Sequence, residues 1–342
     1  MTARSSFSRR QFVATAVGAT ASCLLDCCAA QGSEAPVPQG SEVLPSEPII
    51  DIHQHCNYGG KRDAQWRQIG PARSDAELVA HQQAMGVSQT ILLPAGSPVM
   101  SDSTHQGRGN GLESTCAGVA ACVALAKQYP GRFYFAANEV PDLEGAAQVI
   151  EQSLKSGAVC IGEQKFGVQC DSPQMQTLYQ LAAAYQVPIL MHWQFQSYNY
   201  GYERFFKMLR KHPRTLFIGH AQTVWAHIDK KYFDDAKNLY PRGKVTPGGW
   251  TDRYLSDYPN FFADLSAGSG HNALTRDPAF TRHFLQRHQD KLIFGSDCDD
   301  KIGRGETCTG WSTMQAVRQL ASSKSIKRKL LYQNARRLYR LG

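Results

Sequence analysis

Two histidines that alternate along a short apolar run are the strongest chemical signal in the sequence. They stand in the segment Asp51-Ile52-His53-Gln54-His55. Alternate side chains of a β-strand point to the same side and lie about 6 to 7 Å apart, so both imidazoles would face one way. Two imidazoles at this spacing can bind one metal ion. The motif is short, however, and two unrelated histidines on a strand would produce it equally well.

Three further residues of metal-binding type end later apolar runs, namely His192, His220 and Asp297. The chain has 11 histidines in 342 residues, so chance rarely places one at the end of each of two chosen strands. Imidazoles with one carboxylate suit Zn2+, and Mn2+, Fe2+ or Co2+ can use the same set. An aspartate after a strand is also a common helix cap or turn residue, a role that Asp299 or Asp300 could fill here.

The elements that must position these residues alternate in a regular order. Eight short apolar runs are separated by segments of helical periodicity. The expected strands are residues 49–55, 89–94, 133–138, 159–166, 187–192, 216–220, 261–266 and 292–297. The expected helices are residues 75–85, 118–128, 143–155, 174–185, 202–211, 281–288, 310–320 and 326–338. This order predicts an α/β fold, a (β/α)8 TIM barrel in a single domain. A doubly wound sheet is the alternative, but no G-x-G-x-x-G turn follows the first strand.

Two connections, residues 95–114 and 221–259, are longer than ordinary turns. Long loops in a compact domain are usually functional. Both leave the carboxyl ends of strands, the face on which barrel enzymes hold their sites. A third segment, residues 267–271, is expected to be a loop or a simple turn bordering the same face. The weak candidates for substrate binding on this face are Tyr58, Trp193, Arg253 and His271.

The amino-terminal segment has the features of an export signal. Arg9 and Arg10 precede a modest apolar stretch of residues 12–25, which is shorter than the roughly 20 residues of a membrane span. The predicted organisation is a twin-arginine-type signal peptide at residues 1–30, a linker at 31–48 and the barrel at 49–342. Export to the periplasm or another extracytoplasmic space is therefore expected. An ordinary secretory signal is the alternative, and Asp26 disfavours a lipid anchor at the neighbouring cysteines.

Composition and charge narrow the class of protein further. The chain is 42% hydrophobic and 19% charged, with a net charge of +8, which is ordinary for a globular protein. We find no basic block interleaved with aromatic residues, so nucleic acid is not an expected partner.

Of ten cysteines, three precede residue 30, and no C-x-x-C pair occurs. A disulfide framework or a cysteine zinc site is therefore not expected, and each cysteine is interpreted as a small buried apolar residue.

Taken together, these motifs resemble the amidohydrolase superfamily. The resemblance rests on H-x-H in the first strand, histidine after strands five and six, and G-S-D after strand eight. The short G-S-D ending and the strand-seven segment F-A-D-L-S at residues 262–266 resemble its amidohydrolase-2 branch. That branch includes TIM-barrel hydrolases and enzymes similar to aminocarboxymuconate semialdehyde decarboxylase. The resemblance covers residues 49–340.

The resemblance implies specific roles for the residues that match the motifs. His53, His55, His192 and Asp297 would bind a single divalent metal ion, most simply Zn2+. His220 would act as acid and base beside the bound water. Asp297 would accept the water proton as well as bind the metal. A nearby imidazole is suited to passing protons to a leaving group.

Lys165, near the end of strand four, leaves the number of ions open. In two-metal members of the superfamily a lysine at this place is carboxylated and bridges the ions, and the histidines of strands five and six bind the second ion. In single-metal relatives a basic residue there would meet a substrate carboxylate. A third interpretation pairs Lys165 with Glu163 or Asp264.

The function that this pattern favours is metal-dependent hydrolysis of a small ester, lactone or amide by metal-activated water. The alternative within the same family is a metal-dependent lyase that decarboxylates an unsaturated or aromatic acid. A third hypothesis is an exported barrel that binds metal or ligand without catalysis. The expected partner is a small-molecule substrate, with no membrane span in the mature protein, and a homodimer is an open option.

Overall fold

The computed structural model describes residues 47–59, 71–105 and 116–342. The predicted signal peptide at 1–30 and the linker up to residue 46 lie outside the described residues. Pro45–Gly342 forms one compact unit. No helix in the described ranges is long and apolar enough to cross a membrane.

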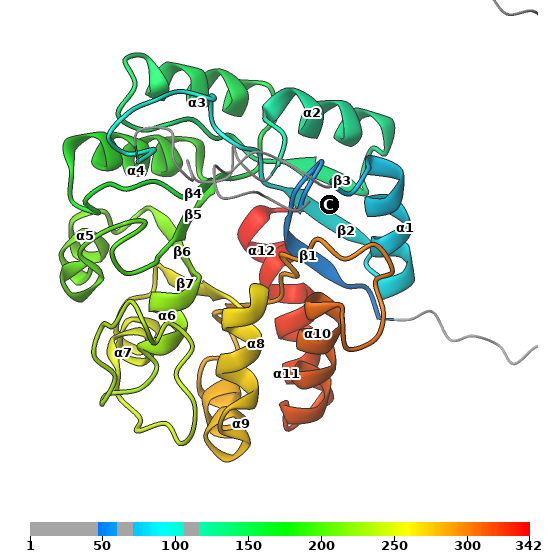
Figure 1. The fold of residues 1–342 in the computed structure, drawn as a ribbon, viewed down its shortest axis with the longest axis vertical. Coiled ribbons are helices and arrows are strands. Elements are labelled where there is room, and N and C mark those ends of the chain that lie inside the picture. Colours follow the sequence, from blue (N-terminus) through cyan, green and yellow to red (C-terminus); the bar gives the residue numbers. More distant parts are fainter. Residues whose placement is uncertain (1–46, 60–70, 106–115) are drawn as a thin grey trace, which may run out of the picture. The chain divides into compact units, whose positions relative to one another are not determined.

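Eight parallel strands follow one another around a barrel in the part of the chain that the structure describes (Figure 1). They are β1 (Ile50–Gln54), β2 (Gln89–Leu92), β3 (Phe133–Phe135), β4 (Ile161–Gln164), β5 (Pro188–His192), β6 (Leu216–His220), β7 (Phe261–Asp264) and β8 (Leu292–Ile293). Ladders join β1-β2-β3 and β4-β5-β6-β7-β8. A single bridge between Ala137 and Ile161 joins these two sheets. The backbone N–H of Ile52 donates to the carbonyl of Phe294 at 3.2 Å and joins β8 to β1. The predicted TIM barrel is confirmed.

Helices follow most strands and cover the outside of the barrel (Figure 1). They are α1 (Asp75–Met85), α2 (Val119–Gln128), α3 (Ala146–Lys155), α4 (Pro173–Tyr185), α5 (Phe206–Lys211), α6 (Gln222–Ala226), α7 (Trp250–Asp257), α8 (Ala267–Thr275), α9 (Pro278–Arg287), α10 (Thr309–Leu320), α11 (Lys324–Arg328) and α12 (Asn334–Tyr339). Local sequence explains several starts. Ser74 and Glu77 form a reciprocal capping box at α1, and Ser172 caps α4 with proline at its first position.

Some expected boundaries were wrong. The segment 221–259, expected as a loop, contains α6 and α7, and residues 267–271, expected as a loop or turn, open α8. Gly268 and Gly270 disfavour a helix by intrinsic propensity. A Cβ on Gly270 would lie only 2.1 Å from the carbonyl oxygen of Leu265, so α8 packs directly on the end of β7. Tertiary packing therefore overrides local propensity there.

Two other helices were predicted as longer single elements. Residues 202–211 form a 3-10 turn (Tyr202–Arg204) followed by α5, and residues 326–338 fall across α11, a π-helical turn (Lys329–Gln333) and α12. The strand expected at 292–297 pairs only at Leu292–Ile293. Beyond this point the chain leaves the ladder, and Asp297 adopts a left-handed backbone conformation with φ 42°.

The barrel interior is filled by branched aliphatic side chains. Ile50, Ile52, Ile91, Leu190 and Ile218 are fully buried in one cluster. The residues of α12 that pack against this cluster are Ala335, Leu338 and Tyr339. The C-terminal helix therefore closes one end of the barrel, which leaves the other end, where the strands finish, for the polar residues.

Candidate metal centre

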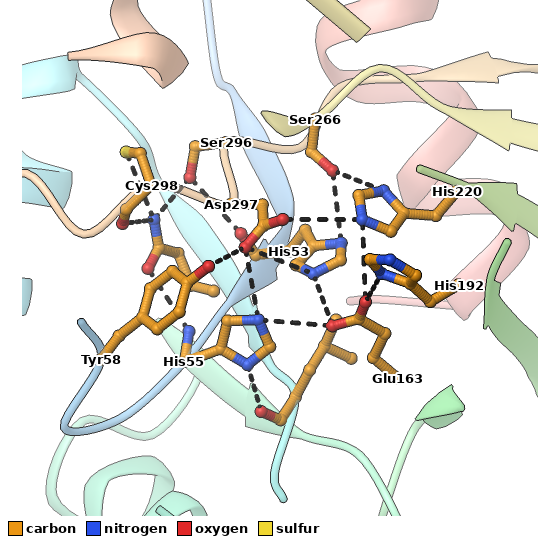
Figure 2. A network of polar contacts seen from close by, with 12 residues as sticks. His53, His55, Tyr58, Glu163, His192, His220, Ser266, Ser296, Asp297 and Cys298 are labelled. Atoms are coloured by element: carbon orange, nitrogen blue, oxygen red, sulfur yellow. Dashed lines mark hydrogen bonds and ion pairs between the residues drawn. The ribbon is translucent and has the colours of Figure 1, made fainter. Parts of the chain in front are cut away.

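Four histidines and three carboxylates gather at the carboxyl ends of the strands (Figure 2). They come from six of the eight strands or the residues just after them: His53, His55, Glu163, His192, His220, Asp264 and Asp297. The Asp297 side chain is 11% exposed, whereas the other six side chains are buried. Polar groups in such a setting need specific partners. We call this group the four-histidine cluster.

Glu163 lies at the centre of the four-histidine cluster. Its Oε2 is 3.2 Å from His53 Nε2 and 3.5 Å from His55 Nε2. Its Oε1 is 2.5 Å from His192 Nδ1 and 3.7 Å from His220 Nε2. Each carboxylate oxygen therefore faces a different pair of histidines, as Figure 2 shows.

Asp297 closes the cluster on the opposite side. Its Oδ1 is 3.4 Å from His55 Nε2 and 3.7 Å from His53 Nε2, and its Oδ2 is 3.5 Å from His220 Nε2. The Tyr58 hydroxyl donates to Oδ1 at 2.8 Å. Aspartate tolerates the left-handed backbone better than most residues, so this conformation can turn the carboxylate towards the histidines.

The outward nitrogens of three histidines are each held by a second group. His53 Nδ1 lies 2.7 Å from Asp264 Oδ2, and His55 Nδ1 donates to the carbonyl of Leu93 at 2.6 Å. His220 Nδ1 lies 3.0 Å from Ser266 Oγ, which itself donates to Asp264 Oδ2 at 2.7 Å. These acceptors favour a proton on Nδ1, which leaves the Nε2 lone pairs directed into the cluster.

The electrostatics of the cluster favour a bound positive charge. Burial lowers the pKa of His53, but the carboxylates of Asp297 and Glu163 raise it well above its ordinary value. Burial raises the pKa of Glu163, yet the neighbouring His53 and His192 hold it well below its usual range. Burial likewise opposes ionisation of Asp264, but its hydrogen bonds to His220 and His53 lower its pKa to about 2. Buried, ionised carboxylates must be paired with cations.

A divalent metal ion fits this arrangement. His55 Nε2 and His220 Nε2 are buried and have no hydrogen-bond partner among the described residues. Ligands about 2.1 Å from one tetrahedral ion lie about 3.4 Å apart, close to the separations of 3.4 and 3.5 Å between His55 Nε2 and the two carboxylates. Burial and the charge of Lys165 lower the pKa of His192 to about 4, which keeps its ring neutral, as a metal ligand must be.

The donors divide into groups that share members. Three-residue groups with mutual separations within 4.8 Å are His53-His55-Glu163, His53-His220-Asp297 and Glu163-His192-His220. Glu163 belongs to two of these groups. The geometry therefore offers a position for a metal ion on each side of Glu163.

The structure brings together His53, His55, His192, His220 and Asp297, the residues that the sequence analysis assigns to the metal centre. The Nζ of Lys165 lies 5.6 Å from the centre of the Tyr198 ring, and its charge acts on His192 of the cluster. Burial lowers the pKa of Lys165, but the charges of Glu163, Tyr198 and Asp297 raise it above its ordinary value. The ammonium therefore stays charged at neutral pH.

The weaker candidates for substrate binding lie in different places. Tyr58 contacts Asp297. Trp193 is fully buried and packs its ring against Tyr202 and Phe205, so it belongs to the core. Arg253 is exposed on α7, where it lines a surface hollow. His271 is half-buried on α8.

Sequence reasoning missed Glu163 as a member of the cluster and Asp264 and Ser266 as its supports. A usable signal existed for Glu163, because it stands two residues before Lys165 and so shares its side of the strand. The strand-seven segment contains both supporting residues, but its sequence alone does not say what they contact.

Three comparisons with known proteins bear on this geometry. A protein-family model described as Amidohydrolase matches residues 50–341. An uncharacterised TIM-barrel protein from Bordetella bronchiseptica is 16% identical with a TM-score of 0.58, over 86% of this chain and 99% of that one. A probable 2-pyrone-4,6-dicarboxylic acid hydrolase from Acinetobacter baumannii is 12% identical with a TM-score of 0.53, over 85% and 98%. A 5-carboxyvanillate decarboxylase from Sphingomonas paucimobilis is 14% identical with a TM-score of 0.53, over 87% and 100%. No curated protein matches the sequence.

Proposed function

Because the chain belongs to the amidohydrolase family, we propose that it is a metal-dependent hydrolase acting on a small ester, lactone or amide. The family and the similar solved structures include hydrolases and decarboxylases. We favour hydrolysis because of the position of Glu163. One of its carboxylate oxygens faces His53 and His55, and the other faces His192 and His220. That arrangement suits two ions that share a carboxylate.

In this proposal the chain holds the ions with nitrogen and oxygen donors only. His53, His55 and Asp297 would hold one ion and His192 and His220 the other, and Glu163 could serve both. A bound divalent ion polarises a carbonyl and lowers the pKa of water towards neutrality. Glu163 would then take the place that the family resemblance implies for a carboxylated Lys165.

In the two-ion arrangement both nitrogens of His220 would be occupied, one by Ser266 and one by an ion. Asp297 would then be the proton acceptor, because a carboxylate that binds an ion through one oxygen keeps its second oxygen available. Burial opposes the ionisation of Asp297, but the charge of His53 and the close approach of the His220 and His55 rings hold its pKa well below the usual range. It is therefore ionised, and Tyr58 fixes its orientation. If a single ion is bound, His220 Nε2 stays free and is the acid and base, as the resemblance implies.

Lys165 orients the substrate in either arrangement. Its charged ammonium interacts electrostatically with Glu163 and Asp297 and can pair with a carboxylate on the substrate. The same observation favours decarboxylation of an unsaturated or aromatic acid as the second candidate function. The two reactions give different products, so product analysis separates them.

The first experiment is metal content per chain, measured on protein purified without added metal. We expect two divalent ions, Zn2+ or Mn2+, in the wild-type cluster and in Lys165→Ala, and a loss of at least one in Glu163→Gln. Glu139→Gln is the matched control, because Glu139 is a buried carboxylate that binds Ser97 outside the cluster. A loss of metal in Lys165→Ala equal to that in Glu163→Gln would instead support a bridging Lys165.

Activity of the metal-loaded protein is then screened on lactones, esters, amides and aromatic acids. Acid release from ring opening or amide cleavage supports the proposal, and CO2 release supports the lyase. Metal-loaded protein that turns over none of these classes would favour the non-catalytic barrel.

A further inference from the structure

A second group of metal-binding atoms lies outside the four-histidine cluster. His81 comes from α1, Cys298 follows Asp297 directly, and Cys308 is the residue before α10. His81 Nε2 is 3.3 Å from Cys298 Sγ and 3.4 Å from Cys308 Sγ, and the two sulfurs are 3.9 Å apart. All three residues are buried. Apolar side chains normally fill a protein core, so two thiols and an imidazole in mutual contact away from solvent are unusual.

These separations match those of a tetrahedral zinc site. With zinc–sulfur distances of about 2.3 Å and zinc–nitrogen distances of about 2.0 to 2.1 Å, ligand sulfurs lie about 3.8 Å apart and sulfur and nitrogen about 3.6 Å apart. Asp300 Oδ2 lies 3.8 Å from His81 Nε2, with its side chain 12% exposed. It accepts hydrogen bonds from the backbone N–H groups of Ile302 and Gly303, and it is the candidate for a fourth donor. Two sulfurs, one nitrogen and one oxygen are a donor set that suits Zn2+.

The surroundings of Cys308 stabilise negative charge on its sulfur. Cys308 is the N-cap of α10, and its Sγ accepts a hydrogen bond from the backbone N–H of Trp311 at 3.3 Å. A helix of 12 residues places positive dipole charge at this end. The Gln54 amide lies 3.8 Å from Cys298 Sγ. Arg73 donates to the carbonyls of Cys298 and Asp300 at 2.8 and 3.0 Å, which places a buried cation beside the group.

We propose that His81, Cys298, Cys308 and Asp300 bind a divalent ion, Zn2+ by donor type, in a structural site separate from the four-histidine cluster. The ion links Cys298 to Cys308 within the segment between β8 and α10, and it links both cysteines to His81 of α1. Cys298 follows Asp297 directly, so the ion also fixes the backbone that carries Asp297. The sequence-based expectation of no cysteine zinc site rested on the lack of a C-x-x-C pair, but these donors come from separate segments.

The test uses the full protein loaded with Co2+ in place of the native metal. Thiolate ligands give cobalt a near-ultraviolet charge-transfer absorption that nitrogen and oxygen donors do not give. We expect this absorption in the wild type and its loss in Cys308→Ser, together with a metal content in native Cys308→Ser that is one zinc equivalent per chain lower than in the wild type. Serine is a good N-cap, so this variant keeps the start of α10 and separates metal loss from helix fraying.

Two controls separate this site from other effects. Cys170→Ser replaces another buried cysteine, whose thiol donates to the carbonyl of Gly201 at 3.3 Å, and should keep both the absorption and the zinc. Glu163→Gln should lose ions from the four-histidine cluster and keep the sulfur-to-cobalt absorption. An unchanged zinc content in Cys308→Ser would overturn the proposal. A disulfide between Cys298 and Cys308 in protein purified without reductant, detected by thiol alkylation and mass analysis, would also overturn it.

Discussion

Replacing Asp264 by asparagine tests whether the supports of the cluster set its affinity for metal. Asp264 Oδ2 accepts hydrogen bonds from His53 Nδ1 and Ser266 Oγ, each at 2.7 Å, and its Oδ1 accepts from the backbone N–H of Ser266 at 3.0 Å. Every one of these partners is a donor. An asparagine at this position has one oxygen and one NH2 group. Whichever way its amide is turned, the NH2 group would therefore face a donor of His53 or Ser266.

The size of the effect follows from these contacts. Removing a group that orients a metal-binding histidine typically costs 10-fold to 100-fold in metal affinity. Asp264 holds His53 directly, and it holds His220 both by a 3.2 Å contact with Nδ1 and through Ser266, so we expect the upper end of that range. A 100-fold loss corresponds to about 2.7 kcal/mol.

Metal affinity would be measured by competition with a chromophoric chelator on folded protein. Asp252→Asn is the matched control, because it changes a buried aspartate on α7 that binds Arg287 and His288 outside the cluster. The control should bind metal like the wild type. An affinity of Asp264→Asn within twofold of the wild type would refute the argument that Asp264 orients the metal-binding nitrogens.

Two further predictions concern single contacts. Tyr58→Phe removes the hydrogen bond to Asp297, and because bonds to charged groups contribute about 1.5 to 3 kcal/mol, we expect kcat on the substrate found in the screen to fall at least about tenfold. An unchanged kcat would contradict a role for Tyr58 in orienting Asp297. Burial raises the pKa of Asp252, but bonds from His288 and Gly248 outweigh it and hold the pKa below the ordinary 3.8. This carboxylate therefore stabilises the fold above that pH and loses its contribution as pH falls through the lower folded value. In urea unfolding, the advantage of the wild type over Asp252→Asn should be constant near neutrality and shrink below about pH 4; an advantage that grew in acid would contradict this sign.

Much of the cluster was predictable from the sequence. Strand periodicity indicates which side chains share a face, and barrel topology brings the ends of the strands together. His53 and His55 alternate on one strand, and His192 and His220 end two neighbouring strands whose register sets them side by side. The carboxyl ends of barrel strands converge, so the alternation of strands and helices was enough to place these histidines together.

Two things could not be predicted from the sequence. One is how far each side chain reaches into the cluster, and the other is which distant segments pack against each other. Glu163 and Lys165 share one side of the chain, and nothing in the local sequence says which of them enters the cluster. The helix α8 forms against the propensity of its glycines because a close approach to Leu265 requires them. His81 and Cys298 are 217 positions apart, and their contact depends on how α1 lies against the segment after β8.

The junction of β8 with β1 also has a consequence for the order of folding. The backbone N–H of Asp297 donates to the carbonyl of His53 at 2.9 Å, and the N–H of Ser296 donates to the Asp51 carboxylate across 245 positions of sequence. Contacts between such distant segments form late, because the entropy of closing a long loop must be overcome first. A chain still being synthesised has its first two histidines long before Asp297 exists. The complete set of donors therefore assembles only when the first and last strands meet, and an ion that binds it stabilises the final step of barrel closure.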